Sequence, residues 1–423
     1  MVPPALRPWL RKPDGAVDRR VWEIGLAMTV RDALKSGDLY LAASKRHVSF
    51  AHMIYNDARW AQGTNLGLAQ MANHNEEVSV DTLQHVAKWY LHEHTIRAAN
   101  AVIVDYMHRL PVSTVWGDGT FSSSDGQRFG IRGRSLLGAL YPRYYGYYER
   151  AVTVYTHQAN FSVFSTQAIS CCEREAMYVL EGLLEQDTIV KHREHTTDTH
   201  GYTEHLFGLC FLLGFSFMPR IADPSHQGLY TMDREVRYGA LEPVFQGAVD
   251  VGLIEEQWDQ LVRLAASMKH RTAKPQDVMQ RLVNSSPSDR LAKALTALSR
   301  IVKTIYVLRY LNDPELRARV QLQLNRGEAR HALARRIFFA ELGEFLPGDY
   351  EEVMNKASCL SLLSNAVTAW NIVKIATIVE ELRRSGTVVT DDDLAHVWPL
   401  ARAHVGTYGT YRFTFPAAQT PRS

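Results

Sequence analysis

Residues 144–156 read YYGYYERAVTVYT, and the wider region from Leu110 to Ala168 is likewise rich in β-branched and aromatic residues separated by Gly. This composition predicts short strands, which we place at residues 114–116, 144–148 and 152–156. A helical pattern at residues 173–185 follows, and a further strand is expected within residues 188–197. Strands, a helix and another strand form the order of a mixed α/β sheet domain rather than of a helical bundle.

The regions on both sides of these strands have a helical pattern. Apolar residues recur every three to five positions in residues 78–106, and again in 223–312 and 347–382, which predicts amphipathic helices. We therefore predict a mixed α/β sheet domain in two parts, 109–222 and 313–346, with a helical insertion at 223–312, a helical region at 1–108 and a helical carboxyl-terminal region at 347–423.

Composition bounds the class of protein. The chain has 423 residues, 47 Lys plus Arg against 45 Asp plus Glu, and 46% hydrophobic residues, so it can bury a sizeable core and its bulk charge indicates no partner. The longest apolar run, Leu206 to Phe217, is shorter than the roughly 20 residues of a membrane span. The four cysteines are irregularly spaced, which favours a reducing, cytoplasmic compartment.

Three polar stretches each centre on a carboxylate: 122–129 (SSSDGQRF), 195–202 (HTTDTHGY) and 324–331 (LNRGEARH). Their carboxylates are Asp125, Asp198 and Glu328. The residues at four-residue intervals around the third should share one helix face and direct Glu328 toward the core; they are Leu316, Val320, Leu324, Glu328 and Ala332. Gly327 would let this helix approach a sheet or a ligand closely.

Three converging carboxylates repel one another unless hard divalent cations neutralise them. The natural interpretation is a two-metal phosphoryl-transfer site that cleaves and rejoins a nucleic-acid backbone. Arginines near the three stretches are candidate phosphate contacts, namely Arg128, Arg193, Arg326, Arg330, Arg335 and Arg336. For Arg335 and Arg336 a solvated helix face is an equally good interpretation.

Alternative roles exist for several residues. A transition-metal site could be built from Asp198 with His192, His195, His200 and His205, but His200 and His205 are five apart rather than the four that a zincin helix requires. Asp118 is a rival for the first carboxylate, although its Gly neighbours favour a turn. Glu204 is expected in the first turn of a helix. Core packing is favoured over base stacking for Trp116, Tyr202 and Trp370.

The segments SSSDGQRFG (122–130), HTTDTHGYTEHLFGLCFLLGFSFMPRI (195–221) and LNRGEARHALARRIFF (324–339) closely resemble the catalytic region of transposases of the Tn-three family of replicative transposons. The resemblance extends from about Arg19 to Phe413. It implies an RNase H-like fold in which Asp125, Asp198 and Glu328 form a DDE triad, with separations of 198 − 125 = 73 and 328 − 198 = 130 residues.

The resemblance also implies two Mg²⁺ ions, for which Mn²⁺ can substitute, and DNA partners comprising transposon ends and target DNA. It further implies a homo-oligomer on DNA and a bacterial, nucleoid-associated location. The expected reaction is cleavage at transposon 3′ ends followed by strand transfer. Full-length members are longer and recognise terminal inverted repeats through amino-terminal domains, so we expect a carboxyl-terminal catalytic portion. The alternative is a truncated, non-catalytic regulator that pairs with a full-length transposase or binds DNA nonspecifically.

Overall fold

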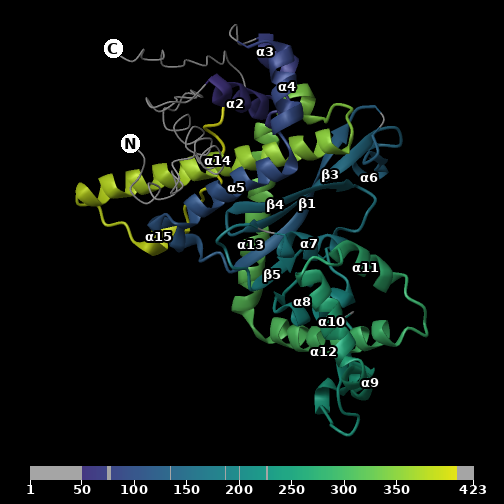
Figure 1. Ribbon diagram of the computed structural model, residues 1–423. Helices are drawn as coiled ribbons and strands as arrows, with labels where there is room; N and C mark the ends of the chain where they lie inside the picture. The colour runs from purple at the N-terminus through teal and green to yellow at the C-terminus, as the bar shows by residue number, and fades with distance from the viewer. Residues whose placement is uncertain are drawn as a thin grey trace, which may run out of the picture.

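The computed structural model describes residues 50–73, 78–133, 135–185, 187–199, 201–224 and 227–406 (Figure 1). Expectations for residues 1–49 and 407–423 therefore lie outside the described residues. Within the described part, the chain is a mixed α/β structure in which helices surround a central mixed sheet.

The central sheet has the strand order β2-β3-β1-β5-β6, with β4 also paired to β3. Its strands are β1 (Phe121–Ile131), β2 (Ala139–Leu140), β3 (Arg150–Ala159), β4 (Ser162–Ser170), β5 (Glu194–Thr197) and β6 (Ser216–Phe217). β1, β3 and β4 form an antiparallel meander, whereas β5 pairs parallel to β1 and β6 pairs parallel to β5. β1 therefore lies between the antiparallel and the parallel halves of the sheet.

Side chains alternate along β1, so its two faces contact different helices. Ser123 accepts a hydrogen bond from Gln323 on α13 (Pro314–Ile337) at 3.1 Å, and Phe129 packs edge-on against Phe338 just after that helix. The opposite face of the sheet is covered by α7 (Val179–Leu184), whose Val179 carbonyl oxygen lies 2.9 Å from the His157 Nε2 atom on β3.

A second helical layer covers β4. It contains α2 (Phe50–Gly63), α5 (Glu93–His108) and α14 (Tyr350–Arg384), and α14 and α5 run side by side in Figure 1. Asn365 on α14 accepts a hydrogen bond from the Val163 amide and donates one to its carbonyl, while Asn100 on α5 donates to the same carbonyl. These bonds satisfy part of the outer edge of β4, which would otherwise be open to pairing.

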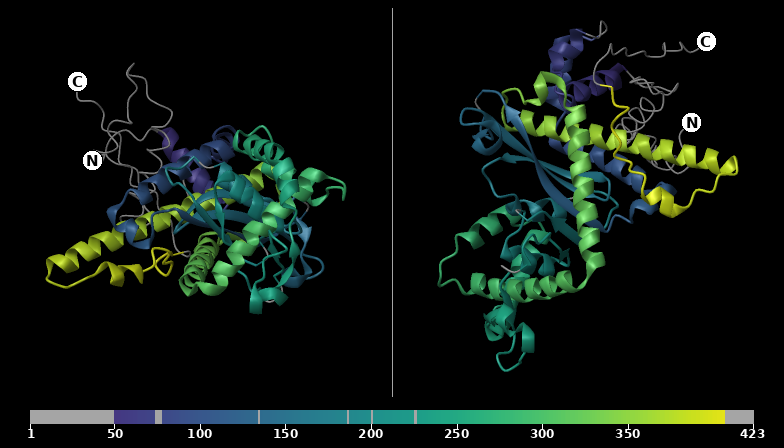
Figure 2. Two further views of the ribbon diagram at one scale, coloured as in Figure 1. Left: turned by 90° about the horizontal axis from the view of Figure 1, so that it is seen from below. Right: turned by 180° about the vertical axis from the view of Figure 1, so that it is seen from behind.

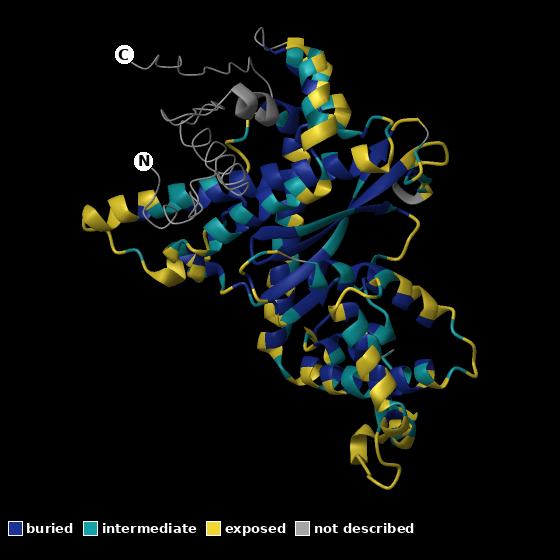
Figure 3. Ribbon diagram, viewed as in Figure 1, coloured by how far each residue is buried: buried dark blue, intermediate teal, exposed yellow. Residues whose placement is uncertain are grey.

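α14 is long and apolar enough to cross a membrane by composition alone, but 61% of that apolar window is buried within the protein. It therefore serves as a core helix here. The smaller helices of this side are α3 (Leu68–Asn73), α4 (Val80–Tyr90) and α15 (Asp391–Ala395). Figure 3 shows that the sheet is almost entirely buried between the layers.

The region after β6 is mostly helical and projects from the sheet (Figures 1 and 3). It contains β7 (Leu229–Thr231), β8 (Phe245–Ala248), α9 (Val251–Glu256), α10 (Trp258–Lys269), α11 (Pro275–Val283) and α12 (Arg290–Asn312). The sequence did not predict the parallel β7–β8 pair. α12 packs closely on α8 (Glu204–Leu213), because a Cβ atom at Gly208 would lie 2.4 Å from Ser299 Oγ.

α12 and α13 meet at a corner, which is visible in the right panel of Figure 2. One residue, Asp313, ends α12 and caps α13: its carboxylate accepts a hydrogen bond from the Leu316 amide at 3.0 Å. Pro314 follows as the first residue of α13, where a missing N–H group costs nothing. The projecting region is thus joined directly to the helix that carries Glu328.

Two of the predicted strands are wrong. Residues 114–116 belong to a 3-10 helix, Pro111–Trp116, and residues 144–148 contain the end of α6 (Pro142–Tyr145) and a turn. In both cases a proline occupies the first helical turn, where its fixed φ favours a helix over a strand. Gly146 then adopts φ +76°, which ends α6. Residues 152–156 and 194–197 do form strands, as predicted.

Candidate active site

Asp125 and Asp198 are separated in sequence by the same number of residues as the paired positions of strands β1 and β5. β1 pairs parallel with β5 so that Ser122 is opposite His195 and Ser124 is opposite Thr197, an offset of 195 − 122 = 73 residues. Asp125 and Asp198 have the same offset, so Asp198, the first residue after β5, follows directly beside Asp125. Neighbouring strands are about 4.8 Å apart, and the two carboxylates are therefore close enough to repel each other.

Glu328 approaches Asp125 from α13, but not from the buried face that the sequence predicted. Among the residues at four-residue intervals along α13, Leu316 and Val320 are buried and Leu324 is half-buried. The Glu328 side chain is 75% exposed. A helix turns about 100° per residue, so each four-residue step rotates the row by about 40°. Glu328 consequently lies at the rim of the sheet.

Gly327 does not bring the backbone of α13 close to the sheet. A Cβ atom at this position would have no atom within 4 Å, so the predicted tight packing of the helix backbone against a sheet is wrong for this structure.

A histidine that the sequence did not single out completes the cluster. His331 lies one helical turn after Glu328, and its Nδ1 atom is 3.8 Å from Asp125 Oδ2 and 3.9 Å from Glu328 Oε2. One ligand atom from each of Asp125, Glu328 and His331 lies within 4.8 Å of the others. The i, i+3 spacing of the glutamate and the histidine was the available signal in the sequence.

The environment of Asp125 strongly disfavours a negative charge. Burial, together with the nearby Glu175, Asp198 and Glu328 carboxylates, raises the pKa of Asp125 to about 8, although the Gly126 amide donates to its Oδ1 at 2.8 Å and acts in the opposite direction. Its side chain keeps 27% exposure, so a cation can reach it. Glu175, in a short 3-10 helix before α7, was not predicted as part of this environment.

The predicted phosphate-binding arginines have different surroundings. Arg330 is buried and donates to the Thr156 hydroxyl on β3, which argues against the predicted DNA contact. Burial lowers its pKa to about 10, whereas Asp125 and Glu328 act to raise it. Arg128 pairs with Glu175 at 3.2 Å and lies over the Tyr141 ring.

Arg326 is half-buried, and its Nη1 lies 3.4 Å from side-chain oxygens of Asn160 and Gln323. Burial lowers the pKa of Arg326 to about 10.

The described histidines of the alternative metal site do not gather around Asp198. His195 is buried and forms hydrogen bonds with Ser122 and Ser124, at 2.8 and 2.9 Å. His192 stacks on Phe164, and His205 lies 3.2 Å from Thr296 Oγ1. His200 lies outside the described residues.

Other rival interpretations are settled by local contacts. Asp118 accepts hydrogen bonds from both the amide and the hydroxyl of Thr120, which makes it a turn residue as favoured. Glu204 opens α8 and pairs with Arg300 at 3.3 Å. Trp116 is buried, and its indole donates to the Val397 carbonyl at 2.7 Å, which is consistent with core packing.

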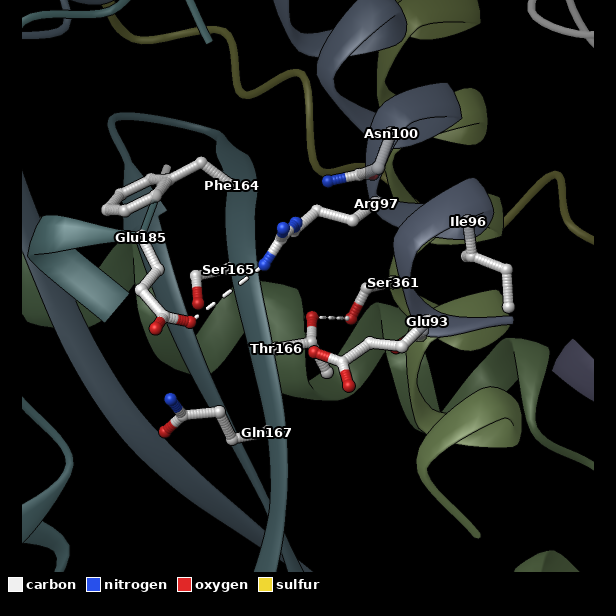
Figure 4. Close-up of a pocket in the computed structure, with 11 residues that line it drawn as sticks. Glu93, Ile96, Arg97, Asn100, Phe164, Ser165, Thr166, Gln167, Glu185 and Ser361 are labelled. Carbon is white, nitrogen blue, oxygen red and sulfur yellow. Dashed lines mark hydrogen bonds and ion pairs between the residues drawn. The ribbon is translucent and has the colours of Figure 1, made fainter. Parts of the chain in front are cut away.

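The carboxylate cluster is reached from solvent through Glu328, whose side chain is exposed, and through the partly exposed Asp125. The small cavity in Figure 4 lies between α5, β4 and α14, where Thr166 donates to Ser361 and Arg97 faces Glu185 at 3.9 Å. Its volume of about 30 Å³ suits one or two water molecules. An open rim is accessible to an extended polymer such as a DNA duplex.

Comparison with known proteins supports the resemblance seen in the sequence. Residues 44–411 match the Tn3 transposase DDE domain. The chain is 38% identical over 352 residues to the transposase for transposon Tn1546 of Enterococcus faecium. It is 37% identical over 375 residues to that for Tn2501 of Escherichia coli, and 37% identical over 349 residues to that for Tn501 of Pseudomonas aeruginosa. These matches cover 83%, 86% and 82% of this chain but only 35%, 38% and 35% of the relatives.

Proposed function

The chain belongs to the Tn3 transposase DDE family, and from that premise we propose that it is the catalytic region of a DNA transposase. Its reaction is metal-dependent cleavage at transposon 3′ ends and strand transfer into target DNA during replicative transposition. The observation that carries the proposal is the meeting of Asp125 with Glu328 and Asp198 at the rim of the sheet. There, burial and the nearby Glu175, Asp198 and Glu328 carboxylates raise the pKa of Asp125 to about 8. Such a cluster is built to hold cations.

The proposed fold of the catalytic domain is RNase H-like. The strand order supports this assignment, since an antiparallel meander of β1, β3 and β4 is extended on the other side of β1 by the parallel strands β5 and β6. α7, α8 and α13 then follow the strands as connecting and terminal helices. The proposed domain limits remain 109–222 and 313–346, with the insertion at 223–312.

Asp125, Asp198 and Glu328 are the proposed metal ligands. Their carboxylate oxygens are the donors that Mg²⁺ and Mn²⁺ prefer, and the unfavourable charge at Asp125 provides the reason for a cation to bind there. Two bound ions would activate the attacking oxygen and stabilise the leaving oxygen.

The chain's own residues hold charge and substrate in place. In the metal-free protein at pH 7, Asp125 carries a proton, because its pKa is about 8. Arg330 supplies a fixed positive charge beside this carboxylate from the buried side. Arg128 and Arg326 are proposed to contact DNA phosphates at the rim, which requires Arg128 to exchange part of its pairing with Glu175.

The proposed partners are transposon-end and target DNA, on which the protein acts as a homo-oligomer. A bacterial cytoplasmic location follows from the proposed DNA substrate and from relatives of bacterial origin. The presence of an acidic cluster with the donors of a metal site does not favour the alternative of a non-catalytic regulator.

The test is a nicking and strand-transfer assay on a transposon-end duplex with Mg²⁺ or Mn²⁺. Asp125→Asn, Asp198→Asn and Glu328→Gln should each lower the rate by about a thousandfold or more, since each removes a ligand from a site that supplies several kcal/mol. Asp118→Asn removes the same charge from the turn before β1 and should leave the rate unchanged. Equal rates for Asp125→Asn and the parent chain would refute the proposal.

A further inference from the structure

We propose that His331 is a metal ligand, which supplies a nitrogen donor beside the oxygens of Asp125 and Glu328; this inference rests on the proposed metal-dependent function. His331 Nδ1 lies 3.8 and 3.9 Å from the nearest oxygens of these two carboxylates. Two donors bound at about 2.1 Å to one ion can be at most about 4.2 Å apart. The two histidine distances therefore fit a shared cation.

The same distances are too long for hydrogen bonds. The His331 side chain is only 9% exposed, and its Nε2 atom is buried without a hydrogen-bond partner among the described residues. A buried imidazole without partners is costly, so a structural role alone leaves this side chain poorly satisfied. A cation at Nδ1 would bring this ring nitrogen and both carboxylates into one set of ligands, with the proton of the neutral ring on Nε2.

The position of the imidazole is defined by the backbone. Gln127 on β1 donates from Nε2 to the His331 carbonyl oxygen at 3.0 Å, which ties this turn of α13 to the strand that carries Asp125.

This assignment divides the site into two unequal halves. One ion takes Asp125, Glu328 and His331, and the other shares Asp125 with the neighbouring Asp198. A nitrogen donor suits Mn²⁺ and other transition metals better than Mg²⁺, which prefers oxygen. The half that contains His331 should therefore favour Mn²⁺, while the all-oxygen half should discriminate less.

The direct test is electron spin echo envelope modulation of Mn²⁺ bound to the 423-residue chain. We expect ¹⁴N modulation in the parent chain, and its loss in His331→Asp, which keeps a donor at this position but offers oxygen. His205→Asn is the matched control, because His205 lies outside the cluster with a Thr296 contact, and it should keep the modulation. The ratio of Mn²⁺ to Mg²⁺ affinity should fall about tenfold in His331→Asp.

Bound Mn²⁺ without ¹⁴N modulation in the parent chain, or modulation that persists in His331→Asp, would overturn the assignment. His331→Gln, which adds no charge beside the carboxylates, replaces the aspartate variant if circular dichroism shows the latter to be unfolded. The Asp125→Asn variant distinguishes failure of the proposed metal-dependent function from failure of the His331 assignment. If it abolishes Mn²⁺ binding while the parent shows no ¹⁴N modulation, the proposed function stands and His331 is not a ligand. If Mn²⁺ fails to bind, or binds equally to Asp125→Asn, both fail.

Discussion

The two faces of β1 both carry polar side chains at the centre of the sheet, but these side chains have different hydrogen-bond partners and different charged neighbours. Toward α7, Ser122 and Ser124 hydrogen-bond His195, and Tyr155 donates to Ser124 at 2.7 Å. Toward α13, Asp125 faces other carboxylates and has a strongly raised pKa.

On the α7 face His195 and the two serines are paired and closed to solvent, whereas on the α13 face Asp125 lies among carboxylates and keeps 27% exposure. The comparison shows that one strand can hold a hydrogen-bonded polar network on one side and an acidic cluster on the other, because its side chains alternate between the two faces. The charge effects still cross the strand, since Glu175, which lies against Gly126 on the α7 side, raises the pKa of Asp125.

The largest expected effect comes from breaking the closed face. His195→Ala removes a fully buried ring and leaves two serine hydroxyls without their partner, which should lower the free energy of unfolding by about 3–4 kcal/mol. Urea denaturation measures this change. A loss below about 1 kcal/mol would show that the neutral network contributes little to stability. Mn²⁺ binding to the fraction that remains folded should be unaltered.

Removing a carboxylate from the α13 face should raise the free energy of unfolding. Asp125→Asn eliminates a carboxylate whose folded pKa, about 8, lies above its ordinary value of 3.8. The metal-free protein should therefore become more stable at pH 8 by about 2–3 kcal/mol, a figure reduced for the partial exposure of the group. Thermal melting in EDTA measures the gain, with Asp118→Asn as the control for lost charge. A lower melting temperature for Asp125→Asn would contradict it.

The two faces should also respond to pH with opposite signs. Burial lowers the pKa of His157 to about 4 and of His192 to about 3, so the folded state binds fewer protons than the unfolded state below pH 6.5. Stability should fall as pH drops below 6.5, by at most about 1.4 kcal/mol per pH unit for each histidine. Asp125 binds an extra proton when folded, so its contribution falls as pH rises from about 4 to 8.

Denaturation of the metal-free chain across pH 4–9 tests this dependence. Asp125→Asn should remove the decline in stability between pH 6.5 and 8, and it should steepen the dependence between pH 4 and 6.5, where the aspartate and the histidines oppose each other. A decline between pH 6.5 and 8 that persists in Asp125→Asn would show that another group is responsible for it.

The smallest expected effect is that of Gly327→Ala, which tests whether the space beside Gly327 on α13 is open. Gly327→Ala adds a methyl group where no atom lies within 4 Å, and it removes the helix penalty of glycine. The metal-free chain should gain about 0.5–1 kcal/mol. Chemical denaturation provides the measurement, and a loss of stability would show that the space beside Glu328 is closed in solution.

The sequence predicted the carboxylates better than their arrangement. The polar stretches and the helical pattern around Glu328 are local signals. The pairing of β1 with β5, which brings Asp125 and Asp198 together across 73 residues, is a long-range contact. It depends on how β3, β4 and α7 return the chain to β1. Glu328 was placed on the wrong side because a four-residue row drifts around the helix. The aromatic composition of residues 144–148 suggested a strand, but Pro142 and Gly146 decided otherwise.

The corner at Asp313 relates the direction of α12 in the projecting helical region to the position of Glu328 at the site. Glu328 lies 15 residues along α13 from this corner, or about 22 Å at 1.5 Å per residue. A rigid tilt of α13 by about 5° would displace the glutamate by about 2 Å, which is the length of one metal–oxygen bond. Hydrogen bonds from Gln323 to Ser123 and from Gln127 to the His331 carbonyl tie α13 to β1 over this length. The angle at which α13 leaves the corner therefore decides where Glu328 meets the rim of the sheet.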